Sequence, residues 1–206
     1  WHITRQQSLE EDSTDKISEK AMTEWSKKRK VMHHYDRLAA IYDAQYADEQ
    51  NAKIKAALNS VSLEKDSFIL DAGCGTGLLF EHLLNRAELI IGLDTSSKIL
   101  SKAKERVKQF PKVCVIRADA DHVPVRNEVF DAVFAITLLQ NMPKPVKTLH
   151  EMKRVSRRNA FIIATGLKKE FTQEAFTNLL SEAGLRIVVM KTDGQLKGYV
   201  AICRKP

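Results

Sequence analysis

The stretch FILDAGCGTG, residues 68–77, joins a short apolar run to an aspartate and three closely spaced glycines. The apolar residues 68–70 predict a buried β-strand that ends at Asp71. Glycine then occupies every second position, at Gly73, Gly75 and Gly77. Because glycine has no Cβ, such a loop turns tightly and lets a ligand approach the main chain. The stretch therefore predicts a strand that runs into a ligand-binding loop.

The rest of the chain alternates between apolar runs of strand length and amphipathic helical segments. Further strands are expected at 89–94, 113–116, 129–136, 160–164, 185–190 and 199–203, the last two as a hairpin. Helices are expected at 31–61, 78–84, 97–109, 145–155 and 172–183. This alternation is typical of a doubly wound, Rossmann-like α/β fold. We expect a mostly parallel seven-stranded sheet with helices on both faces and an antiparallel C-terminal strand.

A change of composition near residue 30 predicts the domain organisation. Residues 1–30 are polar and show no sustained apolar period, and the sequence begins with Trp1 rather than methionine. We expect them to form an arm that is either unstructured or foreign to the natural chain. Residues 31–206 are expected to form a single domain.

Composition excludes several classes of protein. No apolar run is long enough to cross a bilayer and no signal-like leader opens the chain, so we expect no membrane span and a cytoplasmic location. The cysteines, Cys74, Cys114 and Cys203, lack CxxC spacing, which argues against a disulfide framework or a metal site. All three lie in or beside expected strands and are predicted to be buried. The net charge of +7 favours a phosphate-bearing partner.

Acidic residues end three successive expected strands: Asp71, Asp94, and the pair Asp119 and Asp121 in ADAD. In a doubly wound sheet, ligands bind beyond the carboxyl ends of the strands. An acid after the second strand is well placed to accept hydrogen bonds from a ribose diol, and one in the third loop can accept from a purine amine. Asp71 can pair with a cationic amino group. Carboxylates repel phosphate, so a positively charged nucleoside fits this set better than a pyrophosphate.

The chain resembles the class I S-adenosylmethionine-dependent methyltransferases in four segments that occur in this order: ILDAGCGTG, LDTSSKIL, ADADHVPVRNEVFDAVFAITLLQN and LHEMKRV. It is most similar to the type-11, ubiquinone-biosynthesis-like branch, over residues 31–165. In addition, HYDRLAAIYDAQY resembles the amino-terminal helix of that branch, where an aromatic residue often closes over the cofactor. The resemblance implies S-adenosyl-L-methionine as cofactor and direct in-line transfer of a methyl group to a nucleophile.

The resemblance also implies the residues that contact the cofactor. Those expected at its methionine end belong to the first loop: Asp71, Gly73, Gly75 and Gly77. Those expected at the ribose and adenine follow the second and third strands: Asp94, Thr95, Asp119 and Ala120. Thr137 is expected to border the sulfonium and the substrate, and Tyr35 and Tyr42 are expected lid residues. For the tyrosines, burial in the core is the alternative.

No residue stands out as a catalytic base. The candidates are His122 beside the ADAD loop, His150 on the helix after the fourth strand, and Asn141. Asn141 belongs to residues 139–143, where amino-methylating relatives carry an Asn/Asp-Pro-Pro-aromatic clamp. This sequence reads Asn-Met-Pro, which argues against methylation of adenine N6 or glutamine N5.

Basic residues form four groups, at 27–30, 98–112, 144–158 and 168–169. We expect the first and third groups to flank the mouth of the site, which suits a phosphate backbone. No sizeable insertion supplies a lid over a small substrate. We therefore expect the acceptor to be RNA, either tRNA or rRNA, or a translation-related protein.

Some relatives that methylate such targets need a small zinc-binding activator subunit, and we expect one here if apolar surface lies near the third strand. The alternatives are a methyltransferase for a small, quinone-like molecule and a catalytically idle binding scaffold. A nicotinamide enzyme fits poorly, because the loop reads GxGxG rather than GxGxxG.

Overall fold

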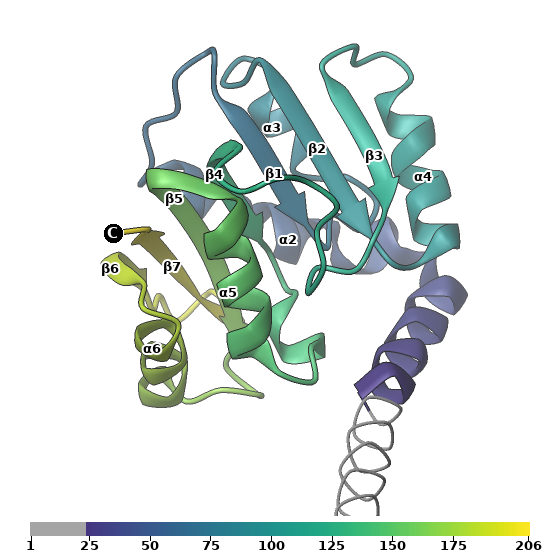
Figure 1. Cartoon of the computed structure of the whole chain (residues 1–206). Helices are drawn as coiled ribbons and strands as arrows, with labels where there is room; N and C mark the ends of the chain where they lie inside the picture. Colours follow the sequence, from purple (N-terminus) through teal and green to yellow (C-terminus); the bar gives the residue numbers. More distant parts are fainter. Residues whose placement is uncertain (1–23) are drawn as a thin grey trace, which may run out of the picture.

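The computed structural model describes residues 24–206. They contain one seven-stranded sheet with the strand order β3-β2-β1-β4-β5-β7-β6 (Figure 1). The strands are β1 (Phe68–Ala72), β2 (Leu89–Asp94), β3 (Val113–Arg117), β4 (Phe130–Ala135), β5 (Ser156–Leu167), β6 (Arg186–Lys191) and β7 (Gly198–Arg204). Neighbours from β3 to β5 are parallel, whereas β7 is antiparallel to both β5 and β6. The expected doubly wound sheet with an antiparallel C-terminal strand is confirmed.

Helices cover both faces of the sheet. They are a helix at residues 24–38, α2 (Tyr42–Leu58), α3 (Phe80–Leu83), α4 (Ser97–Val107), the 3₁₀ turn η1 (Leu139–Asn141), α5 (Pro145–Val155) and α6 (Gln173–Glu182). The buried side chains of α2, α3 and α4 pack on one face, and those of α5 and α6 pack on the other. Ser96 and Thr172 start α4 and α6 by accepting hydrogen bonds from main-chain amides of the first turn.

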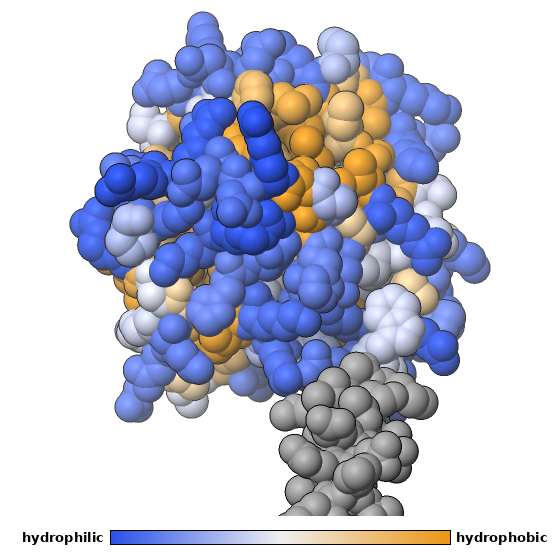
Figure 2. Space-filling view, viewed as in Figure 1, coloured by the Kyte–Doolittle hydropathy of each residue, from blue (hydrophilic) through white to orange (hydrophobic). Residues whose placement is uncertain are grey.

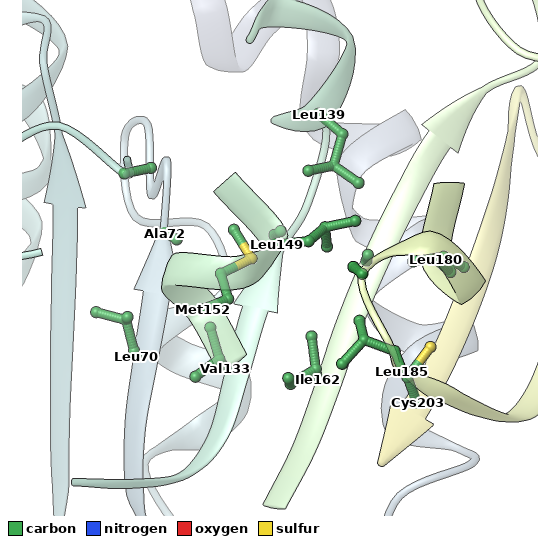
Figure 3. Close-up of a cluster of buried hydrophobic side chains, with 14 of the residues drawn as sticks. Leu70, Ala72, Val133, Leu139, Leu149, Met152, Ile162, Leu180, Leu185 and Cys203 are labelled. Atoms are coloured by element: carbon green, nitrogen blue, oxygen red, sulfur yellow. The ribbon is translucent and has the colours of Figure 1, made fainter. Parts of the chain in front are cut away.

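The core on the second face lies where α5 and α6 meet the middle of the sheet (Figure 3). Leu70, Val133 and Ile162 project from neighbouring strands toward α5. Leu149 and Met152 of α5 are fully buried against them. These strands are buried on both faces, which explains why they read as continuous apolar runs in the sequence.

The amino-terminal helical region differs from the expectation of one pattern from residue 31. The structure has a helix at 24–38, a turn at 39–41 and then α2. The first helix crosses the predicted domain boundary at residue 30, because its polar start is held by ion pairs that an apolar period cannot reveal. The boundary itself stays a prediction, and residues 1–23 lie outside the described residues. The helix expected at 78–84 is shorter, since Phe80 is the first residue of α3.

One part of the sheet is not covered by any helix of residues 24–206. Beyond α5, apolar side chains of β1, β2 and β3 are only partly buried, namely Phe68, Ile91 and Ile116. Figure 2 shows apolar surface over this region, which we name the open sheet face. Cys114 of β3 is exposed there, so its predicted burial is wrong, while Cys74 and Cys203 are buried as predicted. Within residues 24–206, no helix is long and apolar enough to span a membrane.

Candidate functional site

Three adjoining hollows lie at the carboxyl ends of the central strands, where doubly wound sheets bind ligands. The lining of the first, the deep hollow, includes Gly75, Asp94, Ala118, Asp119, Leu138 and Met142. The lining of the second, the loop hollow, includes Asp71, Cys74, Thr76 and Leu79. The third, the wide cavity, has a volume of about 670 Å³, and its lining includes Tyr46, Glu49, Gln50, Gln140, Lys168 and Lys197.

The glycines of the first loop have two different roles. Gly73 and Gly75 line both the deep hollow and the loop hollow, with φ angles of +73° and +56°. A Cβ added at Gly75 would meet no atom within 4 Å, so a side chain there would extend into open space at the hollows. Gly77 lines neither, and a Cβ there would lie 2.4 Å from the ring of Phe80. Its absent side chain therefore serves packing.

Asp94 connects the first loop to the second. Its Oδ2 accepts a hydrogen bond from the main-chain N–H of Gly75 at 3.1 Å, and its Oδ1 accepts from that of Ser96 at 2.9 Å. Burial raises the pKa of Asp94, and these hydrogen bonds oppose the rise. Thr95 lines the deep hollow beside it. The carboxylate is thus held in a fixed orientation at the edge of the deep hollow.

Asp71 is a buried acid that forms no ion pair with any cation of residues 24–206. Its residue is 2 % exposed, and no side chain of residues 24–206 donates a hydrogen bond to it. Burial, and then the neighbouring charge of Asp94, raise the pKa of Asp71 to about 8. A positive group in the loop hollow would favour the ionised carboxylate. This is the chemistry expected for a site that receives an ammonium group.

Asp119 and Asp121, from the third loop, are bridged by a lysine that sequence reasoning missed. Lys28 Nζ lies 2.8 and 2.7 Å from the two carboxylate oxygens of Asp119 and also donates to Asp121 Oδ2. Asp121 is further fixed by the hydroxyl of Thr148. Ala120, between the two acids, lines the deep hollow. The third loop is therefore linked to the first helix across 91 positions in the chain.

The helix at 24–38, which we name the roof helix, lies over the deep hollow. Four of its residues line that hollow at the spacing of one helix face: Lys28, Val31, Met32 and Tyr35. Tyr35 Oη accepts a hydrogen bond from Asn141 Nδ2 at 3.0 Å. Asp36 Oδ1 accepts from Ser96 Oγ at 2.6 Å. Figure 1 shows the helix at the carboxyl end of the strands.

Thr137 stands between the deep hollow and the wide cavity and lines both. Its φ of +60° is unusual for a β-branched residue. Its hydroxyl donates to Gln50 Oε1 at 2.8 Å and accepts from Lys53 Nζ at 3.0 Å, and its N–H donates to Thr165 Oγ1 at 2.7 Å. Its carbonyl accepts from Asn141 Nδ2 at 3.0 Å. A residue with a strained backbone, whose hydroxyl, N–H and carbonyl groups all form hydrogen bonds, is typical of a functional site.

Tyr42 lines all three hollows and therefore stands at their junction. Its ring lies between those of Tyr35 and Tyr46, with centroid distances of 5.9 and 5.1 Å. Burial raises the pKa of Tyr42, so the phenol stays neutral at physiological pH. The three tyrosines form one aromatic wall of the wide cavity.

Glu49, which lines the wide cavity, forms an ion pair with a lysine buried behind it. Lys53 is fully buried, and its Nζ lies 2.6 Å from Glu49 Oε1. Burial lowers the pKa of Lys53, whereas the paired lysine lowers that of Glu49 against the effect of burial. Lys197, at 3.3 Å, also contacts this carboxylate. No pattern in the sequence marks Lys53, because an isolated lysine in a helix is ordinarily exposed.

The catalytic candidates are placed differently from one another. Asn141 lines both the deep hollow and the wide cavity. His122 is exposed, with its Nε2 3.3 Å from Lys147 Nζ, and His150 is exposed on α5, and neither lines a hollow. Of the basic groups, the fourth lines the wide cavity rather than the first or third. Lys28 of the first group is turned inward instead.

The model of a family described as a methyltransferase domain, type 11, matches residues 70–164. Among curated proteins, malonyl-[acyl-carrier protein] O-methyltransferase of Marinomonas sp. is 29 % identical over 148 residues, covering 70 % of this chain and 54 % of that protein. The ubiquinone/menaquinone biosynthesis C-methyltransferase UbiE of Campylobacter jejuni is 28 % identical over 165 residues, covering 71 % and 66 %. The chain spans about half the length of the first relatives.

Solved structures share the fold at low identity. One is a complex between the Haloferax volcanii Trm112 methyltransferase activator and a protein described as a methyltransferase, with a TM-score of 0.74 and 16 % identity over 84 % of this chain and 97 % of that chain. A methyltransferase from Aquifex aeolicus has a TM-score of 0.69 and 19 % identity over 85 % and 98 %. The [4+2]-cyclase SpnF also matches, with a TM-score of 0.68 and 18 % identity over 74 % and 79 %. The fold alone therefore does not fix the reaction.

Proposed function

Residues 70–164 belong to the type-11 branch of the class I S-adenosylmethionine-dependent methyltransferases, and on that premise we propose that this protein methylates an acceptor bound in the wide cavity. The observation that carries the proposal is the position of Tyr42 and Thr137. Both line the deep hollow and the wide cavity, so a group in one can reach a group in the other.

The residues present fit S-adenosyl-L-methionine. Asp71, buried and lacking a cation, suits the ammonium of its methionine end. We assign Asp94 to the ribose hydroxyls and the third loop with Asp119 to the adenine edge, and in support both acids line the deep hollow. The bare backbone at Gly75 leaves room beside them. The assignment of these residues to parts of the cofactor is part of the proposal.

When bound, the cofactor supplies a methyl group that is already activated toward attack. The chain must therefore position and orient the cofactor and the acceptor, and it must exclude water. The roof helix covers the deep hollow, and the held hydroxyl of Thr137 sets the border with the acceptor. Tyr42 and Asn141 confine the passage between the two. We assign no catalytic base, since neither His122 nor His150 lines the cavity.

The test measures binding before transfer. Calorimetry is expected to show binding of S-adenosylhomocysteine and none of NADH. Radiolabel from methyl-labelled S-adenosylmethionine is then followed into RNA, protein and lipid fractions. Binding without transfer into any fraction would favour an idle scaffold, and absence of binding would overturn the proposal.

For the acceptor we propose RNA, either tRNA or rRNA, or a translation-related protein. Lys168, Lys169 and Lys197 border the wide cavity, and the chain carries a net charge of +7, which both suit a polyanion. Label in the RNA or protein fraction is the expected result. Label only in the small-molecule or lipid fraction would favour the alternative that the names of the relatives support, a small-molecule acceptor.

As a partner we propose a small activator subunit that covers the open sheet face. Support comes from the partly exposed Phe68, Ile91 and Ile116, from the free edge of β3, and from the neighbour solved with Trm112. Ile116→Glu should abolish co-purification with a co-expressed zinc-binding activator, whereas Val188→Glu, at an exposed apolar position on β6, should not. Equal capture by both variants, or none by the natural chain, would contradict this proposal.

A further inference from the structure

Lys28 makes an unusually complete set of contacts for a lysine on a polar helix. Its side chain is 10 % exposed, and its ammonium contacts both oxygens of Asp119 and one of Asp121. Its neighbours Lys27 and Lys30 are exposed. The ion pair is therefore specific to one position of the helix.

The contact joins the roof helix to the deep hollow at the end opposite Tyr35 and Asp36. These two residues fasten the later turns of the helix to Asn141 and to the start of α4. Lys28 fastens the earlier turns together with the more exposed ion pair of Glu24 and Lys144, and Val31 and Met32 lie over the hollow between these attachments and the later ones. A nucleoside in the deep hollow would lie beneath this face, so opening of an attachment would widen its route in and out.

Breaking the ion pair between Lys28 and Asp119 changes the charge that faces a ligand in the deep hollow. Without its ammonium, Asp119 and Asp121 would face each other as two carboxylates bridged by no cation. A ligand group that donates a hydrogen bond to Asp119 would share that carboxylate with Lys28, because the carboxylate oxygens have lone pairs enough to accept from both donors. A ligand at Asp119 would therefore compete with Lys28 for the same carboxylate.

We propose that Lys28 is a positioning residue that fastens the roof helix over the deep hollow, and that its release controls entry and exit of the nucleoside. This inference rests on the proposed function, because it takes the nucleoside to be S-adenosylmethionine or its product. The rate at which the nucleoside enters and leaves would then depend on the roof helix, which lies outside the sequence motifs of the sheet.

The test is a pair of rate measurements on the full chain with S-adenosylhomocysteine as probe. Trp25, half exposed and three positions from Lys28, reports helix movement by its fluorescence once Trp1 is replaced by phenylalanine. Lys28→Met is expected to speed dissociation about 10-fold or more and to speed association too, because loss of charge-assisted bonds frees the helix. Lys30→Met removes the same charge from an exposed site and should leave both rates unchanged.

Two further measurements separate fastening from mere stability. Lys28→Arg keeps the charge and should restore most of the slow dissociation. Hydrogen exchange of residues 24–38 in the ligand-free protein should rise in Lys28→Met and not in Lys30→Met. If Lys28→Met does not fold, Lys28→Gln replaces it.

The outcomes are distinct. Dissociation from Lys28→Met at the rate of the natural protein overturns the fastening role, even if the variant melts at a lower temperature. A natural protein that binds no S-adenosylhomocysteine overturns the proposed function, and the fastening of a nucleoside with it. Fast dissociation with rescue by arginine supports the proposal.

Discussion

The deep hollow and the wide cavity lie on either side of Tyr42 but are built in different ways. The deep hollow is formed mainly by loops that directly follow β1, β2, β3 and β4, at one edge of a parallel sheet. The wide cavity is formed by the end of the roof helix, α2, the segment after β4, the end of β5 with the residues that follow it, and Lys197 before β7. The first is a property of the sheet, and the second depends on packing between distant segments. Beneath the roof helix, the wall of the deep hollow therefore comes from short segments that each follow one strand, whereas the wide cavity has no such source.

The largest expected effect is on the deep hollow, through Gly75→Val. A β-branched residue at a φ of +56° is strained, and its side chain would extend into the hollow. We expect binding of S-adenosylhomocysteine to weaken about 100-fold or more, or about 3 kcal/mol, measured by calorimetry. Gly194→Val, also with open space around its Cβ but with no positive φ, should bind normally. Equal binding by both variants would separate this loop from the cofactor.

The next effect concerns the wide cavity, through Glu49→Gln. Removing the carboxylate leaves the fully buried Lys53 without its ionic partner, and we expect a loss of about 2–4 kcal/mol in the free energy of unfolding. Urea denaturation measures it. Glu170→Gln, on the exposed wall of the same cavity with a 3.9 Å contact to Lys169, should change stability by less than about 0.5 kcal/mol. Similar losses of stability in the two variants would mean that the ion pair of Glu49 with Lys53 contributes no more than an exposed one.

Asp94→Ala returns to the deep hollow with a smaller effect. It removes the acceptor of two loop amides and of the proposed ribose contacts, so binding of S-adenosylhomocysteine should weaken by about 1–3 kcal/mol. Asp48→Ala, exposed on α2, is the matched control. A dissociation constant equal to that of the natural chain would rule out the ribose assignment.

A prediction of another kind, about the dependence of stability on pH, comes from Asp71. Burial, and then the charge of Asp94, raise its pKa to about 8 in the folded protein, far above the ordinary value of 3.8 that applies in the unfolded chain. Between these values the folded state holds the additional proton, so ligand-free stability should fall as pH rises from about 4 to about 8, by at most about 1.4 kcal/mol per unit. Asp71→Asn should flatten this slope in thermal melts. An unchanged slope would contradict the raised pKa.

A bound ammonium should reverse the effect of pH at this site. Because the cation favours ionised Asp71, binding of S-adenosylhomocysteine below pH 8 should release a proton. Calorimetry in buffers of different ionisation enthalpy detects that release. Its loss in Asp71→Asn would assign the proton to this carboxyl.

Most of the sheet and the deep hollow followed from sequence patterns. Residues 68–77 predicted a strand and a loop, and Gly75 and Asp94 do line the hollow. The apolar runs predicted their strands because β1 and β4 are buried on both faces. The exposure of Cys114 was missed, because the sequence does not show that a strand of the sheet lacks a covering helix.

The residues that sequence reasoning missed owe their roles to partners far along the chain. Lys28 lies among other lysines and differs from them only because the helix turns it toward Asp119. Lys53 lies in an ordinary polar stretch of α2 and becomes buried only when Thr137 and Glu49 surround it. The face formed by 28, 31, 32 and 35 had a helical spacing, but its charged first member concealed the period.

The sequence by itself determined the alternation of strands and helices, the glycine loop and the acids at the strand ends, because these depend on neighbours within a few positions. Only the tertiary structure decided that Lys28 pairs with Asp119, that Lys53 is buried, and that three hollows meet at Tyr42. The physical reason is that ion pairs and cavities form between segments that are far apart in the sequence and close in space. Lys28 and Asp119 are 91 positions apart and yet in contact, and no local period encodes such a contact.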